Sequence, residues 1–271
     1  MLNSFQVKLI KSIENGVLEE TKRLAIGKFD IDKPLVPSLE IPIKPPSKKV
    51  PFPVIRGPTP LILAILYERT DIAKYLLVEK HARLTVKANG LYPIHYACIV
   101  GKLDLLQIIL ETDEGKEQIN LQNDYLYTPL HLAAANSHIQ LVLLLLKNGA
   151  KCNNKDFKQL PDTKNNVLHV CMRNSDISIV EALLSKGANL DEVNSENETP
   201  YQTAFFFHNE QMIEFLQKYA TNPSIVRPFE ILCKKYLDEE VISSESEQLQ
   251  SLSEQLRVLT NKLENLEQSK Q

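Results

Sequence analysis

Residues 128–150, TPLHLAAANSHIQLVLLLLKNGA, decide the fold of this chain. Thr128 is a suitable helix N-cap because its hydroxyl can accept a backbone N–H of the first turn, and Pro129 fits the first helical position. After a polar break, residues 141–146 form an apolar run without a polar face, and Gly149 suits the end of this second helix. The stretch therefore predicts a short helical pair whose apolar surface must be covered by similar neighbours.

Four further segments that align with this one predict such neighbours. They read TPLILAI, YPIHYAC, NVLHVCM and TPYQTAF, and they begin at Thr59, Tyr92, Asn166 and Thr199. Together with Thr128, successive starts are 33, 36, 38 and 33 residues apart. A period of about 33 residues with the pattern T-P-L-H-x-A is typical of ankyrin repeats, and residues 4–220 resemble the ankyrin-repeat family. The resemblance implies an all-α solenoid of about five to six stacked helical hairpins with β-turn tips.

Composition argues against several classes of protein. The chain has 271 residues, of which 43% are hydrophobic and 24% charged, and its net charge of −3 is unlike that of a basic nucleic-acid-binding domain. It has no apolar stretch of the about 18–20 residues that a membrane span needs, and residues 1–16 lack the apolar run of a secretory signal. The four cysteines form no CxxC pair, which is typical of reduced thiols. We expect a cytoplasmic protein, with the nucleus as the alternative, and no nucleic-acid or membrane partner.

Changes in composition divide the chain into five parts. We predict a degenerate N-terminal capping repeat at 1–32, a proline-rich insertion at 33–57, the repeat array at 58–220, a C-terminal capping helix at 221–240 and a coiled-coil-like acidic tail at 241–271. In the first part, Leu9 and Ile13 share a helical face, and Gly16 separates this helix from a second one. We expect the helix in 221–240 to close the open end of the stack.

The proline-rich insertion has two interpretations. Its seven prolines favour extended backbone and remove hydrogen-bond donors, as in a surface loop. Alternatively, Pro34 to Pro37 and Pro42 to Pro45 both fit PxxP, the pattern of docking peptides for SH3- or WW-like domains. Neither segment has a basic residue at the usual flanking position, which favours the loop.

The tail carries a seven-residue leucine pattern. Two sets of positions, three residues apart, repeat in this way: Ile242, Leu249, Leu256 and Leu263, and then Leu252, Leu259 and Leu266. Such a pattern predicts an amphipathic coiled-coil helix over 242–266, about 37 Å long. Leucine at both positions does not select a partner, so a homodimer and a hetero-coiled-coil both remain open.

No residues of the chain form a recognisable catalytic, cofactor or metal site. His95, His131 and His169 all occupy the fourth position of the TPLH pattern, so stacking should place them about 10 Å apart, too far for the ~2 Å bonds of a shared zinc ion. The resemblance implies that they are structural hydrogen-bonding residues between repeats. Cys98 and Cys171 take the positions of alanines and should act as small hydrophobes. We therefore expect neither an enzyme nor a bound cofactor or metal.

The family resemblance implies a concave partner-binding groove, lined by the β-turn tips and parts of the inner helices. On this chain we assign that surface to Asn89, Leu91, Ile99, Val100, Asp124, Tyr125, Tyr127, Asn136, Asn165, Arg173, Glu196, Glu198 and Phe206. Tyr125 and Tyr127 are candidate anchors, since tyrosine is frequent among residues that dominate binding energy. In the alternative, Leu126 points inward and one of these tyrosines packs on the next turn. Three consecutive aromatic residues, 205–207, cannot all face one core, so at least one should be exposed or covered by the helix in 221–240.

Two functions fit these expectations. The first is a non-catalytic adaptor that holds a partner protein in the groove, while a self-pairing tail links two grooves and raises avidity. The second is a regulatory or assembly factor, an inhibitor or chaperone subunit of an enzyme or larger complex, with the tail as a hetero-coiled-coil. The sequence does not identify the partner in either case.

Overall fold

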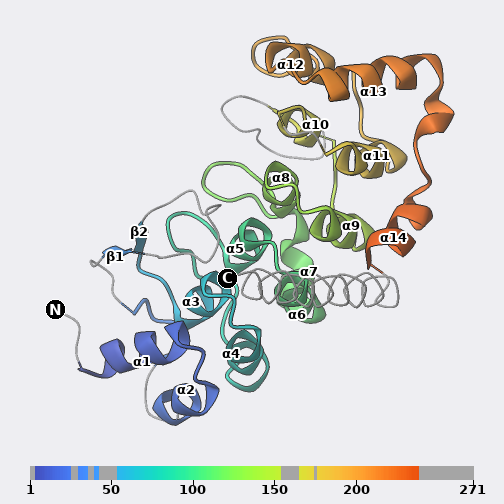
Figure 1. Ribbon diagram of the computed structural model, residues 1–271. Coiled ribbons are helices and arrows are strands. Elements are labelled where there is room, and N and C mark those ends of the chain that lie inside the picture. Colours follow the sequence, from blue (N-terminus) through green and yellow to red (C-terminus); the bar gives the residue numbers. More distant parts are fainter. Residues whose placement is uncertain are drawn as a thin grey trace, which may run out of the picture.

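The computed structural model describes residues 4–25, 30–35, 40–42, 54–153, 165–173 and 176–237. Within these ranges the fold is a row of helical pairs, each stacked on the next (Figure 1). The predicted coiled coil at 242–266 lies outside the described residues, and neither PxxP segment lies wholly within them.

The array has an inner and an outer row of helices, which run side by side in Figure 1. The inner helices are α3 (Pro60–Leu66), α5 (Pro93–Val100), α8 (Pro129–Ala135), α10 (Val167–Cys171) and α12 (Pro200–Phe206). The outer helices are α4 (Thr70–Lys74, continued by a π-helical turn Tyr75–Glu79), α6 (Leu103–Glu111), α9 (Ile139–Lys147), α11 (Ile177–Ser185) and α13 (Glu210–Thr221). Each inner helix packs on the next inner helix, so the apolar faces form one continuous core.

The inner helices begin where the repeat pattern predicts. The hydroxyl of Thr59 accepts a hydrogen bond from the Ile62 N–H at 3.3 Å, and Thr128 and Thr199 cap α8 and α12 in the same way. Asn166 replaces threonine in the fourth repeat, and its Oδ1 accepts from the His169 N–H at 3.0 Å. The four caps satisfy backbone donors that would otherwise lack a partner at the start of each helix.

The N-terminal helices form as predicted. These are α1 (Ser4–Glu14) and α2 (Leu18–Ala25), and they pack on α3 and α4 of the array. Leu9 and Ile13 are fully buried against the first repeat, and Gly16 adopts a φ of 72° between the two helices. This pair therefore extends the core by one more unit.

The proline-rich insertion is not only a loop. It contributes two short antiparallel strands, β1 (Glu40–Pro42) and β2 (Val54–Arg56), with Ile41 opposite Ile55. These are the only strands within the described ranges. The backbone N–H of Arg56 donates to Oδ1 of Asn89 at 3.0 Å, which joins the second strand to the tip of the next repeat.

The C-terminal helix forms but does not close the end of the stack as predicted. After α13 and a 3₁₀ turn (Pro223–Ile225), the chain turns back, and α14 (Phe229–Leu237) packs on α9 and α11 (Figure 1). The Arg227 guanidinium forms an ion pair with the buried Glu181 carboxylate of α11. This charged pair and the apolar side chains of Phe229 and Leu232, both buried, favour the outer row over the open end.

A further short helix, α7 (Asp113–Glu117), followed by a 3₁₀ turn (Gln118–Asn120), accommodates the extra residues between the second and third repeats. The Thr112 hydroxyl accepts from the Gly115 N–H at 3.0 Å and so begins this helix. The irregular spacing seen in the sequence is thus taken up on the outer side of the array, and the inner row continues without interruption.

Candidate protein-binding groove

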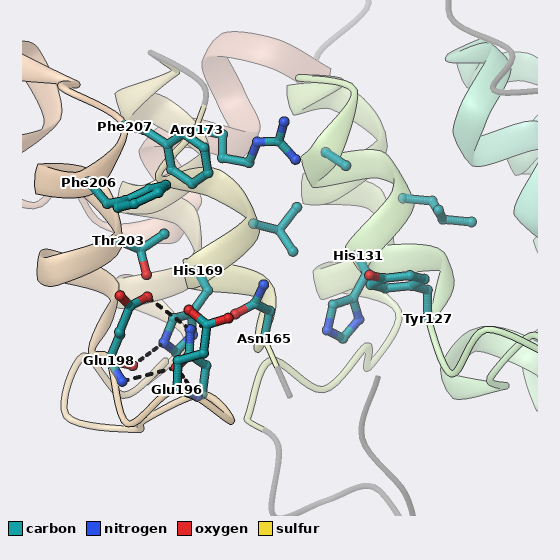
Figure 2. A pocket seen from close by; sticks show the side chains of 14 residues that line it. Tyr127, His131, Asn165, His169, Arg173, Glu196, Glu198, Thr203, Phe206 and Phe207 are labelled. Carbon is teal, nitrogen blue, oxygen red and sulfur yellow. Dashed lines mark hydrogen bonds between the residues drawn. The ribbon is translucent and has the colours of Figure 1, made fainter. Parts of the chain in front are cut away.

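A cavity of about 490 Å³ opens between α8, α10 and α12. Figure 2 shows its lining, which comes from the three inner helices and the turns before and after them. The lining residues are Tyr127, His131, Leu132, Ala135, Asn165, His169, Val170, Arg173, Asn194, Glu196, Glu198, Thr203, Phe206 and Phe207. We call this cavity the groove.

Buried histidines fix the wall of the groove. Nδ1 of His169 lies 2.7 Å from the Asn166 side-chain oxygen and 3.3 Å from the Asn166 backbone nitrogen, and Nε2 lies 2.8 Å from the Glu198 carbonyl oxygen. His95 joins its own repeat to the next one by the same arrangement, with Nε2 3.1 Å from the Leu121 carbonyl. Each of the two rings therefore ties a helix start to the following turn, as the resemblance implied.

Burial keeps these histidines neutral. It lowers the pKa of His95 and His131 from 6.5 to about 4, against the opposing effect of their backbone hydrogen bonds. Burial also lowers the pKa of His169, although the Glu198 carbonyl and two nearby carboxylates oppose the shift. The imidazoles in the groove wall thus carry no positive charge at neutral pH.

The turn between α11 and α12 forms one end of the groove. Asn194 organises it, because its Oδ1 accepts from the backbone N–H groups of Glu196 and Glu198, both at 2.9 Å. Its Nδ2 donates to the side chains of Asn165 at 3.1 Å and Glu198 at 3.3 Å. Asn194 therefore holds the turn backbone, the Asn165 amide and the Glu198 carboxylate together at this acidic end, which also carries Glu196.

Aromatic side chains and one arginine form the opposite end (Figure 2). The Phe206 and Phe207 rings meet edge to face with centroids 5.2 Å apart. The guanidinium carbon of Arg173 lies 4.9 Å from the Phe207 centroid, a cation–π contact. Phe206 is 68% and Phe207 41% exposed, so this end presents a large apolar surface to solvent. All three consecutive phenylalanines are exposed, and α14 covers none of them.

The structure brings six of the predicted partner-binding residues together in the groove: Tyr127, Asn165, Arg173, Glu196, Glu198 and Phe206. Asp124 and Tyr125 are exposed on the neighbouring tip but do not line the groove. Asn136 is half-buried and donates from Nδ2 to the Leu132 carbonyl at 2.8 Å, while Asn89 is half-buried beside β2.

Three predicted contact residues are wrong. Leu91, Ile99 and Val100 are 2%, 1% and 7% exposed, and they pack in the core between the first and third repeats. The prediction assumed that every inner helix presents its end to the groove. In the second repeat, however, all of α5 is buried by its neighbours.

At the tip of the third repeat, one of the two tyrosines is exposed and the other packs against its own repeat. Leu126 is half-buried with a φ of 65°, an uncommon conformation for a residue other than glycine. Asn123 holds this turn by accepting from the backbone N–H groups of Tyr125 and Tyr127 at 2.9 and 3.0 Å. Tyr125 stays 50% exposed, whereas the Tyr127 ring lies 5.8 Å from the His131 ring at the edge of the groove.

Asn123 and Asn194 are the structural residues that the sequence argument missed. Both stand five residues before the capping threonine of their repeat, a coincidence of spacing that could have identified them. Their amide oxygens hold the two tips in the same conformation. They position the tyrosine and the glutamates that the sequence argument did identify.

Within the described ranges, no group of three or more histidine, cysteine or carboxylate side chains is arranged to hold a metal ion. None of the four cysteines forms a disulfide, and burial raises the pKa of the Cys98 and Cys171 thiols well above the ordinary value. A thiol with a raised pKa is a poor nucleophile, which fits the expected packing role.

Among the helices that the structure describes, none has both the length and the hydropathy required to cross a lipid bilayer.

Models of a known repeat family match both halves of the array. Residues 79–156 match a model described as ankyrin repeats (3 copies), and residues 168–217 match one described as ankyrin repeats (many copies). The chain carries ankyrin repeats. The first match includes α8 and the second runs from α10 into α13, so the ankyrin repeats supply most of the groove.

Known proteins with similar ankyrin repeats differ widely. The chain is 29% identical over 134 residues to the B-cell lymphoma 3 protein homolog of Mus musculus, which covers 49% of this chain and 29% of that protein. It is 32% identical over 102 residues to alpha-latrocrustotoxin-Lt1a of Latrodectus tredecimguttatus, covering 38% and 7%. It is 30% identical over 150 residues to phosphocholine transferase AnkX of Legionella pneumophila, covering 54% and 15%. The similarity therefore spans less than a third of each of these relatives.

Ankyrin repeats point in general to binding of protein partners. The name of one relative denotes an enzyme, but only 15% of that protein is matched. The similarity to these relatives lies in the ankyrin repeats, and the groove is lined by this chain's own residues.

Proposed function

We propose that this chain is a non-catalytic adaptor that binds a partner protein in the groove formed by α8, α10 and α12. The observation that carries the proposal is the coincidence of a cavity of about 490 Å³ with an exposed aromatic pair at one end. Aromatic and arginine side chains dominate the binding energy of many interfaces. Phe206, the last residue of α12, supplies one of them here, and Phe207 and Arg173 in the turns after α12 and α10 supply the others.

The array is suited to this role because its rigid parts lie under the contact surface. Leu132, Ala135 and Val170 line the groove between the inner helices, and the buried histidines fix the turns beside it. A preformed surface loses little conformational entropy on binding.

The proposed location of the protein is the cytoplasm, with the nucleus as the alternative, and cell fractionation would test it.

A matched pair of substitutions tests the proposal. Phe205 and Phe206 are adjacent and almost equally exposed, at 67% and 68%, but only Phe206 lines the groove. We expect Phe206→Ala to weaken partner binding by about 2 kcal/mol or more, as for an interface anchor, while Phe205→Ala binds like the wild type. Quantitative affinity purification from the source cells with the three baits would show this difference. Equal recovery of every captured protein by all three baits would refute the groove as the binding surface.

The same experiment addresses the alternative, a regulatory or assembly factor. Loss of one stoichiometric enzyme or complex from the Phe206→Ala sample would favour that role, and loss of several unrelated proteins would favour the adaptor.

Self-association through 242–266 is a separate part of the proposal. Light scattering of the full chain and of a chain ending at residue 240 would test it.

A further inference from the structure

The groove has a charge pattern that the proposed function does not use. At its acidic end, Glu196 is exposed and Glu198 half-exposed; Asn194 holds the backbone of both residues and also donates to the Glu198 carboxylate. Within the ranges that the structure describes, neither carboxylate lies within ion-pair distance of a lysine or arginine. The acidic end is therefore not neutralised by these parts of the chain.

The remaining groove residues do not offset this charge. Burial lowers the pKa of His131 and His169, so both rings are neutral at physiological pH. The one arginine of the groove lining, Arg173, lies at the opposite end on the Phe207 ring (Figure 2). The apolar part of the lining comes from Leu132, Ala135 and Val170, and Thr203 lies between the glutamates and the phenylalanines (Figure 2).

We propose that the groove binds an extended peptide segment that places a lysine or arginine against Glu196 and Glu198 and an apolar side chain against Phe206 and Phe207. This inference rests on the proposed function and specifies the chemistry of its partner. Charge complementarity selects the partner, because an acidic side chain at the first position would face the carboxylates of Glu196 and Glu198. The apolar side chain supplies most of the affinity, because it is the part that is removed from water.

The polarity of the groove also sets the direction of the bound segment. Arg173 can donate to a carboxylate or backbone carbonyl of the peptide beyond its apolar side chain, at the end away from the glutamates. A segment bound in reverse would bring its cation next to the Arg173 guanidinium. The charged ends of the groove therefore set the orientation of the bound peptide, and the aromatic pair supplies most of its affinity.

Display of a library of short random peptides against the full chain tests the inference. We expect the selected peptides to carry lysine or arginine at a fixed spacing from an aromatic or branched aliphatic residue. The charge-neutral variant Glu196→Gln/Glu198→Gln retains the hydrogen-bond acceptor for Asn194, so the turn should stay intact. The control Glu210→Gln/Glu214→Gln removes the same amount of charge from α13, outside the groove.

Binding of one selected peptide, measured by fluorescence anisotropy, gives the decisive comparison. Replacing its cationic residue by norleucine should weaken binding to the wild type and to the α13 control about fivefold, as for a partly exposed ion pair worth about 1 kcal/mol. The same replacement should change binding to Glu196→Gln/Glu198→Gln by less than about twofold.

The outcomes separate this inference from the proposed function. Selected peptides that lack a cation, or an equal effect of norleucine on all three proteins, would overturn the inference. If such peptides still lose binding to Phe206→Ala, groove binding stands without the preference for a cation. Selected peptides that bind Phe206→Ala as well as the wild type would overturn both proposals.

Discussion

The buried histidines make the stability of the array depend on pH in a direction that the structure fixes. His95 and His131 have their pKa lowered from 6.5 to about 4 by burial. The unfolded chain therefore binds protons more readily than the folded chain between these values. Stability is full above pH 6.5 and is lost as the pH falls toward 4. Between pH 7 and pH 5, protonation of each ring lowers the free energy of unfolding by about 2 kcal/mol, because a difference of one pKa unit between the folded and unfolded chain corresponds to about 1.36 kcal/mol.

Urea unfolding followed by circular dichroism at pH 7, 6 and 5 measures this effect. The variant His131→Gln removes one titrating group from a site that is 1% exposed. It should be less stable than the wild type at pH 7, because the contact of the buried ring with the Thr128 hydroxyl, 2.8 Å from Nδ1, is changed. Its further loss of stability between pH 7 and pH 5 should be smaller than that of the wild type by about 2 kcal/mol.

The difference in stability between His131→Gln and the wild type at pH 7 reports on packing, and the change in stability between pH 7 and pH 5 reports on protonation. An NMR titration of the His95 and His131 ring protons in the folded chain gives the pKa values directly. Titration of both rings near pH 6.5, together with equal pH dependence of the wild type and His131→Gln, would refute the argument from burial. Loss of stability at pH 7 alone would not support it.

Two further predictions concern the outer row and the turns of the array. Arg227→Ala leaves the Glu181 carboxylate, whose side chain is 7% exposed, without its ion-pair partner. We expect the free energy of unfolding to fall by about 1–3 kcal/mol and hydrogen exchange in α14 to become faster. Unchanged exchange in α14 would count against the contact. Gly101→Ala should destabilise the chain more than Gly149→Ala, as thermal unfolding would show. Both glycines have positive φ, at 86° and 93°, but only at Gly101 would a Cβ lie 2.2 Å from the His138 ring, whereas nothing lies within 4 Å at Gly149. Equal melting temperatures would contradict the predicted clash.

The repeat pattern predicted the helical pairs because the cap, the apolar run and the stop are local features. Thr128 and Gly149 have the predicted roles, with Thr128 capping α8 and Gly149 in the left-handed conformation after α9. The position of Glu196, Glu198 and Phe206 in the repeat predicts that they face the groove, and all three line it. This worked because each repeat places the same position on the same side.

The errors arose where tertiary packing decides the outcome. Leu91 and Val100 occupy positions that resemble groove positions in the repeat pattern, but the first and third repeats cover them from both sides. The path of α14 was also not predictable from its stripe of apolar residues. That stripe fits either the open end or the outer row, and the partner that favours the outer row, Glu181, lies 46 residues away from Arg227 in sequence.

Because α14 returns to pack on α9, the chain is attached to the stack both before and after the last repeat. In a simple linear stack, the final pair of helices has a free end and can detach without disturbing anything beyond it. Here the pair α12–α13 lies between two anchored segments, α11 and α14, so it is a closed loop of the chain. Opening this pair leaves both of its ends tethered, which limits the entropy gained on release. The aromatic end of the groove, which this pair carries, is therefore held on the stack from both sides.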